Sequence, residues 1–298
     1  MNFIGRIFGA GRINRPANRD FKPEDLPDTR VRLFFDTLKI RWSSMVGLNL
    51  LYLVIWLPAI VWTGINGMAM QQALTEQGEA AFSVVGELTM TWLLLLWPLI
   101  AVTGPWTAGM SFVLRNWARG EHSFVFSDFW EAVKKNWKQA LLVSTVTGVI
   151  PFLFYWLFRF YAQMARSVSA AFLIPQGILL LVATAWVLML EVVYMLMVTY
   201  KFTVRQLLKN ALALSVAKLP AFAGVRLLTL ALPAAMILSL FYAPGSAIYW
   251  WTVGGFFYMV FGFSLNRLLY ASLANWVCEE YINPKIGAPT RMGLRPRT

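Results

Sequence analysis

Long apolar runs separated by short polar segments make up most of this chain. Six of the runs reach about 20 residues, the length with which an α-helix crosses the hydrocarbon core of a bilayer. They cover residues 43–63, 88–114, 140–160, 172–200, 221–242 and 248–269, and the last continues as a helix to 276. The pattern predicts an all-α integral membrane protein. Its six-span helical bundle occupies residues 43–276, between an N-terminal arm (1–42) and a basic tail (277–298).

Three further segments are amphipathic and basic, which is typical of helices that lie in the membrane interface. They cover residues 30–42, 127–138 and 203–217. The order aromatic, acidic, apolar, basic and Trp occurs in both 34–42 and 129–137. Two interpretations stay open: three repeated hairpin units, each with its own interfacial helix, or a basic lead-in that every hairpin starting in the cytoplasm needs. One more interfacial helix is predicted over residues 3–8, where the apolar side chains share a face.

The distribution of positive charge predicts the orientation of the spans. All but three of the 26 Lys and Arg residues lie in the N-terminal arm, in 114–138, in 200–220 or from Arg267 onward. The exceptions are Arg159, Arg166 and Arg226. Because positive loops stay in the cytoplasm, this distribution predicts that the N- and C-termini are both cytoplasmic.

Composition excludes several classes of function. Charged residues make up only 13% of the chain, hydrophobic residues make up 58%, and the mean hydropathy is +0.59. The net charge of +12 belongs to short loops that face anionic lipid, so we expect the lipid bilayer, and no nucleic acid, as a partner. With one Cys and one His, the chain cannot assemble an internal disulfide, the usual zinc site or most pairs of nucleophile and base. We expect no cofactor, no metal and no enzymatic activity.

Glu191 is the first candidate for a site inside the membrane. It lies ten residues before Lys201, which places it about 15 Å from the cytoplasmic interface. Arg226, on the next span, lies at about 12 Å depth and is the expected partner. Three interpretations are open: an ion pair that fixes the two spans, a site for a substrate or a proton, and a protonated Glu191 without a function.

The sequence Thr103-Gly104-Pro105 is the second candidate, because proline kinks or breaks a helix. After a break, Thr103 would cap a new helix N-terminus of the kind that binds anionic groups in transporters. A plain kink is the other interpretation. Asn49, in the first span, completes the candidate mid-membrane site, although an amide there more often bonds a neighbouring helix.

The basic segments also supply candidate docking surfaces on the cytoplasmic side. The residues are Asp128, Glu131, Lys134, Lys135, Lys138, Arg205 and Lys209. A face that is merely solvated fits the same residues. Ser127 is the expected N-cap of the helix that carries the first five.

Several motifs in the chain resemble the YesL family of bacterial membrane proteins of unknown function. They are LNLLY at 48–52 followed by Leu57-Pro58, TGPWTAGM at 103–110, RGE at 119–121, DFW at 128–130, KNWKQA at 135–140 and LLKNAL at 207–212. The resemblance covers most of residues 34–275, and the chain departs from the family pattern by an insertion-like segment over 64–96. It implies a bacterial plasma membrane location and an accessory role beside carbohydrate ABC-transport systems, and it carries over no functional residues.

Two functions are therefore expected. The first is a non-enzymatic accessory or partner-binding multi-pass membrane protein, with ABC-transporter subunits as the partner. The alternative is a secondary transporter or channel, with Glu191, Arg226 and the Thr103-Gly104-Pro105 break along its pathway. The alternative requires a water-filled cavity that reaches Glu191, whereas the first function does not.

Overall fold

The computed structural model describes residues 26–76, 78 and 81–295, and every regular element in this part of the chain is a helix. Six helices are long and apolar enough to cross a membrane. The predicted all-α, six-span class is thereby confirmed. The interfacial helix predicted over residues 3–8, with most of the N-terminal arm, lies outside the described residues.

Most of the helices run longer than the predicted spans, whereas α5 stays within its predicted span. Their bounds are α2 Arg30–Glu76, α3 Ala81–Ala118, α4 Val125–Ser167, η4 Ala170–Phe172, α5 Leu173–Thr199, α6 Val204–Ala217, α7 Leu219–Tyr242, α8 Pro244–Phe257, the π-helix η5 Tyr258–Gly262, α9 Phe263–Tyr281 and α10 Asn283–Ile286. α2 unites the predicted interfacial segment, the first span and the first part of the insertion-like segment, as far as Glu76, in one helix. The predicted boundaries at 42 and 276 both fall inside helices, α2 and α9.

The chain divides into two compact units, which are described separately. Unit 1 comprises Met1–Leu53, Trp106–Asn136 and Leu188–Thr298, and unit 2 comprises Val54–Pro105 and Trp137–Val187. Each of α2, α3, α4 and α5 contributes one part to unit 1 and the other part to unit 2.

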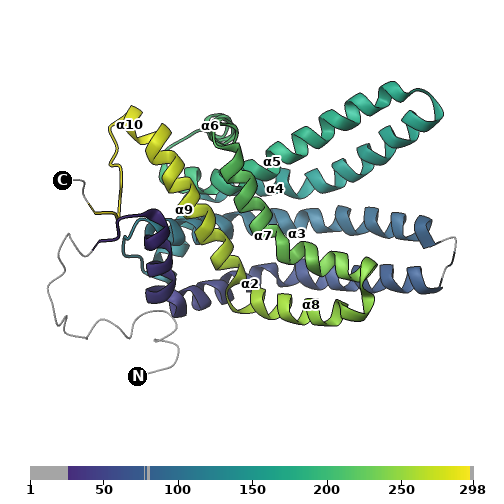
Figure 1. Ribbon diagram of the computed structural model, residues 1–298, viewed down its shortest axis with the longest axis horizontal. Coiled ribbons are helices and arrows are strands. Elements are labelled where there is room, and N and C mark those ends of the chain that lie inside the picture. The colour runs from purple at the N-terminus through teal and green to yellow at the C-terminus, as the bar shows by residue number, and fades with distance from the viewer. Residues whose placement is uncertain (1–25, 77, 79–80, 296–298) are drawn as a thin grey trace. The chain divides into compact units, whose positions relative to one another are not determined.

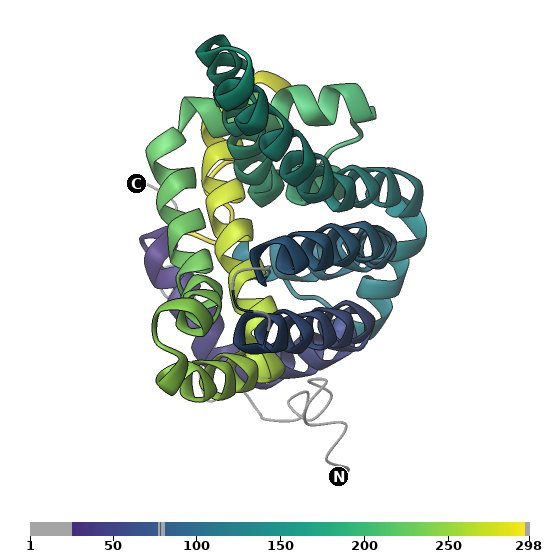
Figure 2. The ribbon, with the colours of Figure 1, turned by 90° about the vertical axis from the view of Figure 1, so that its right-hand side faces the viewer.

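Unit 2 consists of four helical segments that lie side by side in chain order, as Figure 2 shows. The Trp62 indole N–H of α2 donates to the Trp92 carbonyl of α3 at 3.1 Å. The Trp186 indole N–H of α5 donates to the Thr147 hydroxyl of α4 at 3.3 Å. Tryptophan donors thus bond neighbouring helices of this unit.

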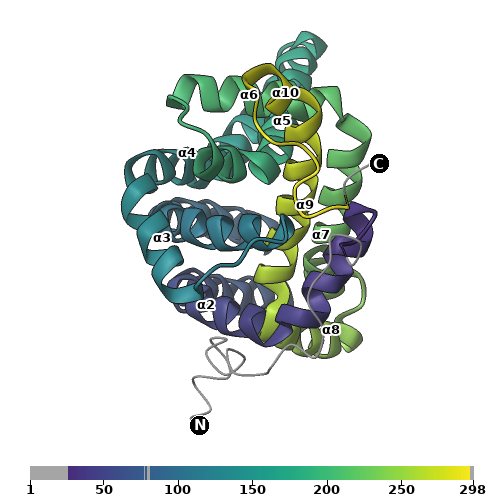
Figure 3. The ribbon, with the colours of Figure 1, turned by 90° about the vertical axis from the view of Figure 1, so that its left-hand side faces the viewer.

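In unit 1, α9 lies beside α7, and α8 folds back along α7 (Figures 1 and 3). The fold-back is tight because Gly254 has no side chain where Met236 packs. The Trp251 indole N–H donates to the Met236 carbonyl at 2.9 Å. α9 buries one continuous face, which includes Leu268, Ala271 and Cys278.

One end of unit 1 is held together by polar contacts. This polar end is formed by the start of α2, the ends of α3, α5 and α9, and the chain after α9. Arg30 forms an ion pair with Glu279 and donates to the Met292 carbonyl at 2.8 Å. The backbone N–H of Arg295 donates to the Pro27 carbonyl at 3.1 Å. The described part of the predicted basic tail is therefore packed against the start of α2.

Candidate functional site

Glu191 and Arg226, the predicted pair, lie together in unit 1. Arg226 Nε is 3.1 Å from Glu191 Oε1, and the Glu191 side chain is 0% exposed. Neither oxygen of the Glu191 carboxylate has a hydrogen-bond partner among the described residues. The carboxylate is therefore neutralised by charge rather than by a full set of hydrogen bonds.

Tyr270 of α9 joins this pair to a third helix. Arg226 Nη1 donates to the Tyr270 hydroxyl at 3.0 Å, and that hydroxyl donates to Thr229 Oγ1 at 2.9 Å. The guanidinium of Arg226 lies 5.1 Å from the centre of the Tyr270 ring, and that of Arg267 lies 5.5 Å from it. One carboxylate, two guanidiniums and a phenol thus connect α5, α7 and α9. Such a cluster can fix three helices in the membrane without any chemistry.

Asn49 makes a separate polar contact in unit 1. Its side-chain amide donates to the carbonyls of Tyr258 and Met259 at 2.8 and 2.9 Å, and its oxygen accepts the Ser264 backbone N–H at 3.1 Å. These partners flank or belong to the π-helix η5, whose wider turn leaves backbone groups without helical partners. Since both amide hydrogens are used, the contacts of Asn49 bond α2 to the last span rather than leave donors for a ligand.

Of the two interpretations of Thr103-Gly104-Pro105, the helix break is wrong, because α3 continues unbroken from Ala81 to Ala118. Thr103 does not cap a helix, and its hydroxyl donates to the Ile100 carbonyl in the same helix at 2.8 Å. Proline at 105 leaves the carbonyl of Ala101 without its helical N–H donor. The Ser144 hydroxyl of α4 donates to that carbonyl. A neighbouring helix thus replaces the hydrogen bond that proline removes, and no helix N-terminus opens inside the membrane.

Gly104 allows this replacement because it has no side chain. A Cβ at Gly104 would collide with the Ala140 carbonyl and with Ser144. One turn further along α4, a Cβ at Gly148 would lie 2.7 Å from the Trp97 carbonyl. Ala140, Ser144 and Gly148 are spaced four residues apart, a pattern of small residues that lets membrane helices approach closely. This spacing was the signal in the sequence that could have identified Ser144.

The candidate mid-membrane residues fall in different units. Glu191, Arg226 and Asn49 belong to unit 1, whereas Thr103, Gly104 and Pro105 belong to unit 2. The contacts described above for each set lie within its own unit. Sequence reasoning missed Tyr270, although a tyrosine three residues after Arg267 in an apolar span was visible as a polar group that needs a partner.

The candidate docking residues are mostly exposed. Glu131, Lys134, Lys135, Lys138, Arg205 and Lys209 are exposed, and Asp128 is half-buried. Asp128 closes the start of α4, because its Oδ2 accepts the Ser123 hydroxyl at 2.6 Å and the Phe124 backbone N–H at 2.9 Å. The expected N-cap at Ser127 is therefore wrong, since α4 begins two residues earlier, at Val125.

Tyr200 and Lys218, which lie in the connections on either side of α6, contact residues at and after the end of α9. Tyr200 follows α5, and its hydroxyl donates to Asn283 Oδ1 at 2.5 Å. Burial raises the pKa of Tyr200 above its ordinary value, so the phenol stays a neutral donor. Lys218 lies between α6 and α7, 2.7 Å from Glu280 Oε1, and the hydrogen bond to this carboxylate raises the pKa of Lys218.

Residues 87–158 match DUF624, a family described as a protein of unknown function. The match covers α3 from Glu87 and α4 as far as Phe158, which includes the contact of Gly104 with Ser144. The resemblance to the YesL family is compatible with this match. No curated protein and no solved structure matches the chain.

Proposed function

We propose that this chain is a non-enzymatic accessory protein of the bacterial plasma membrane that binds a partner through helices on its cytoplasmic side. The predicted orientation puts both termini, the polar end of unit 1 and α6 in the cytoplasm. The resemblance to the YesL family suggests the partner, a carbohydrate ABC transporter. An interfacial position of α6 is part of the proposal, and its place between two candidate spans supports it.

The observation that carries the proposal is the two-sided surface of α6. One face is buried in unit 1 through Leu207, Ala211, Leu214 and Ser215. The opposite face exposes a stripe of two basic and two apolar side chains, which we call the α6 stripe: Arg205, Lys209, Leu212 and Val216. Leu212 is 43% and Val216 is 64% exposed. A helix anchored on one face that presents charge and apolar surface on the other fits a docking element.

The start of α6 is fixed as well. The Thr203 hydroxyl accepts the Gln206 backbone N–H, and Gln206 Oε1 accepts the Thr203 backbone N–H, so that the two residues form a capping box. Because the helix is formed in advance, binding costs little ordering of the backbone. The enclosed Glu191, by contrast, offers no support for a transport pathway, and the transporter alternative stays a prediction.

Affinity purification of the full chain from native membranes, followed by mass spectrometry, tests the proposal. ABC-transporter subunits are expected to co-purify with the wild-type chain. Lys209→Glu, in the α6 stripe, is expected to lower their recovery about fivefold or more, since a central interface side chain contributes roughly 1 kcal/mol or more.

Lys285→Glu is the matched control, because Lys285 is also an exposed lysine and lies on another helix, α10. Its recovery of partners is expected to equal that of the wild type. Equal loss in the two variants, or a wild-type chain that retains no transporter subunit, contradicts the proposal.

A further inference from the structure

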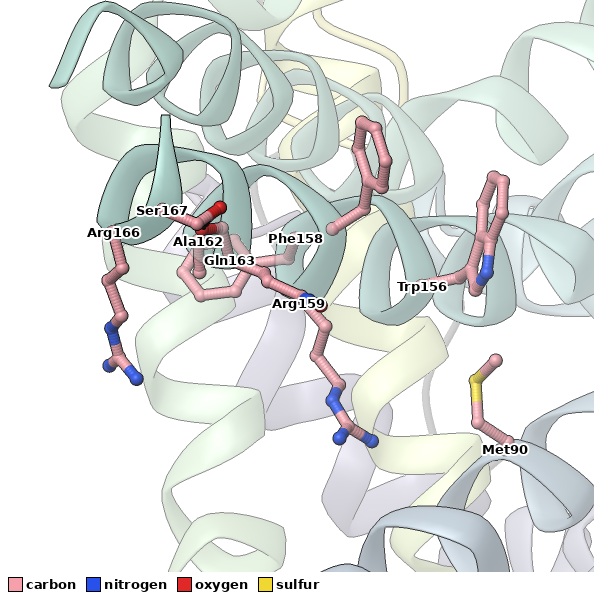
Figure 4. A pocket seen from close by; sticks show the side chains of 9 residues that line it. Met90, Trp156, Phe158, Arg159, Ala162, Gln163, Arg166 and Ser167 are labelled. Atoms are coloured by element: carbon pink, nitrogen blue, oxygen red, sulfur yellow. Dashed lines mark hydrogen bonds between the residues drawn. The ribbon is translucent and has the colours of Figure 1, made fainter. Parts of the chain in front are cut away.

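A cavity of about 710 Å³ lies in unit 2, along the last turns of α4 (Figure 4). Its wall consists of the segment of α4 from Trp156 to Ser167, together with Met90 of α3. The volume falls in the range of sites that bind small molecules. None of the mid-membrane or docking residues discussed above lines this cavity.

Two guanidinium groups give the cavity its charge. Arg159, Gln163 and Arg166 lie at positions i, i+4 and i+7 of α4 and therefore share one face of the helix. Figure 4 shows that both arginine side chains extend from α4 toward the same side. No acidic residue lines the cavity, and neither arginine has an ion-pair partner among the described residues. Within the described residues, no ion pair neutralises the two guanidiniums at the cavity.

Arg159 is held in place by neighbouring groups. Its Nη1 donates to the Tyr155 hydroxyl at 3.2 Å, and the guanidinium lies 5.5 Å from the centre of the Tyr155 ring. The guanidinium also lies against Gly86 of α3, where a Cβ would be only 2.7 Å from Nη1. Arginine carries five N–H donors in a planar fork. Arg159 is exposed, so most of these donors stay available to a ligand after the contact with Tyr155.

The remaining wall is apolar, with Trp156, Phe160 and Met90 beside the polar face. Arg159 lies 22 residues after Trp137 on the continuous α4, which corresponds to about 33 Å. That distance is close to the thickness of the hydrocarbon core, about 30 Å. A cavity at this level can receive an anionic group among its guanidiniums and an apolar group against its aromatic wall.

We propose that this cavity binds a phosphate group, through Arg159 and Arg166 with Gln163 as an additional donor. Guanidinium groups match the geometry of phosphate oxygens and bind them in pairs. The phosphate comes either from the headgroup of an anionic phospholipid or from a soluble phosphate ester. The inference is independent of the proposed partner-binding function, because the cavity is lined by residues of α3 and α4 and by none of the α6 stripe.

Native mass spectrometry of the full chain in detergent tests the inference. The two probes are dioleoyl-phosphatidylglycerol and glycerol 3-phosphate, each titrated separately. At least one of them is expected to bind the wild type, and Arg159→Gln with Arg166→Gln is expected to weaken that binding about tenfold or more. Binding of the lipid alone assigns the headgroup as the source, and binding of glycerol 3-phosphate assigns a soluble ester.

Two further variants separate the site from folding and from net charge. Gly86→Ala keeps both arginines but displaces Arg159, so it is expected to weaken binding while the chain stays folded. Lys201→Gln with Lys285→Gln removes two exposed positive charges of unit 1 and is expected to bind like the wild type. The inference is overturned if neither probe binds, or if the control pair loses as much binding as the arginine pair.

Discussion

The ion pair of Glu191 with Arg226 connects two helices of unit 1, α5 and α7. A carboxylate with 0% exposure in an apolar helix is costly unless a cation neutralises it. Arg226 supplies that charge, and Tyr270 fixes the orientation of the guanidinium. The arrangement explains why the pair persists without a complete set of hydrogen bonds to the carboxylate.

The first prediction concerns this pair. Glu191→Gln or Arg226→Gln alone is expected to lower the free energy of unfolding in detergent by about 3–5 kcal/mol, since either change leaves one charged partner buried alone. The double variant is expected to cost at least about 1 kcal/mol less than the sum of the single variants. Denaturation monitored by circular dichroism measures all three. Additivity within about 0.5 kcal/mol contradicts a direct interaction.

Sequence alone could predict the pair but not its surroundings. Counting residues from Lys201 and Lys218 puts both charges at a similar depth, and opposite charges at one depth in a membrane are expected to pair. Tyr270 lies on a helix remote in sequence, and which helix packs there is decided by the whole fold. The hydrogen bonds from Asn49 to the carbonyls of η5 were not predicted either. The sequence of residues 258–262 contains no pattern that indicates a π-helix.

At the scale of elements, a wider helical turn is stabilised by one amide. η5 interrupts the last span, and Asn49 of α2 bonds two carbonyls and one N–H beside it. No water is available at this depth to replace those bonds. The side chain of Asn49 thus stabilises the π-helical turn η5 against α2.

Replacement of this amide gives the second prediction. Asn49→Leu is expected to destabilise the chain by about 2 kcal/mol, because three bonds are lost and each contributes roughly 0.6–1 kcal/mol. Asn66→Leu is the matched control, since Asn66 is a buried asparagine of the same helix that donates to Trp62 within its own helix. A smaller loss, under about 1 kcal/mol, is expected there. Thermal unfolding in detergent compares the two, and equal losses contradict the role of Asn49.

The close approach of α3 and α4 gives the third prediction. Gly104→Ala forces a methyl group against the Ala140 carbonyl and Ser144, which is expected to cost about 1–3 kcal/mol. Gly64→Ala, in open space on α2, is expected to be neutral or to stabilise by up to about 1 kcal/mol. If the two substitutions have the same effect on thermal unfolding, α4 does not pack closely against Gly104.

The prolines show why element boundaries were harder to predict than element types. Periods and apolar lengths identified six spans, because burial in lipid requires long apolar helices. Pro105 predicted a kink or a break, yet the helix continues because Ser144 supplies the missing donor from another helix. Similarly, nothing local to residue 42 or 276 stops α2 or α9, so the helices pass the limits that hydropathy suggested.

At the scale of the whole molecule, the orientation predicted from charge can be tested directly. Ser169 lies between α4 and α5, and Lys201 lies between α5 and α6, so they belong to loops on opposite sides of one span. In intact bacterial cells, a membrane-impermeant thiol reagent is expected to label Ser169→Cys and to leave Lys201→Cys unlabelled. Cys278 is buried and is expected to contribute little background. The reverse labelling pattern overturns the cytoplasmic assignment of α6.

The central claim is that the exposed face of α6 contacts a partner in the membrane of the living cell. A photo-crosslinking amino acid at Leu212, in the α6 stripe, tests it most directly, with the buried Leu207 on the opposite face as the matched position. After irradiation of intact cells, an adduct with an ABC-transporter subunit is predicted from position 212 and not from position 207. Absence of an adduct at 212, or equal adducts at both positions, contradicts the claim.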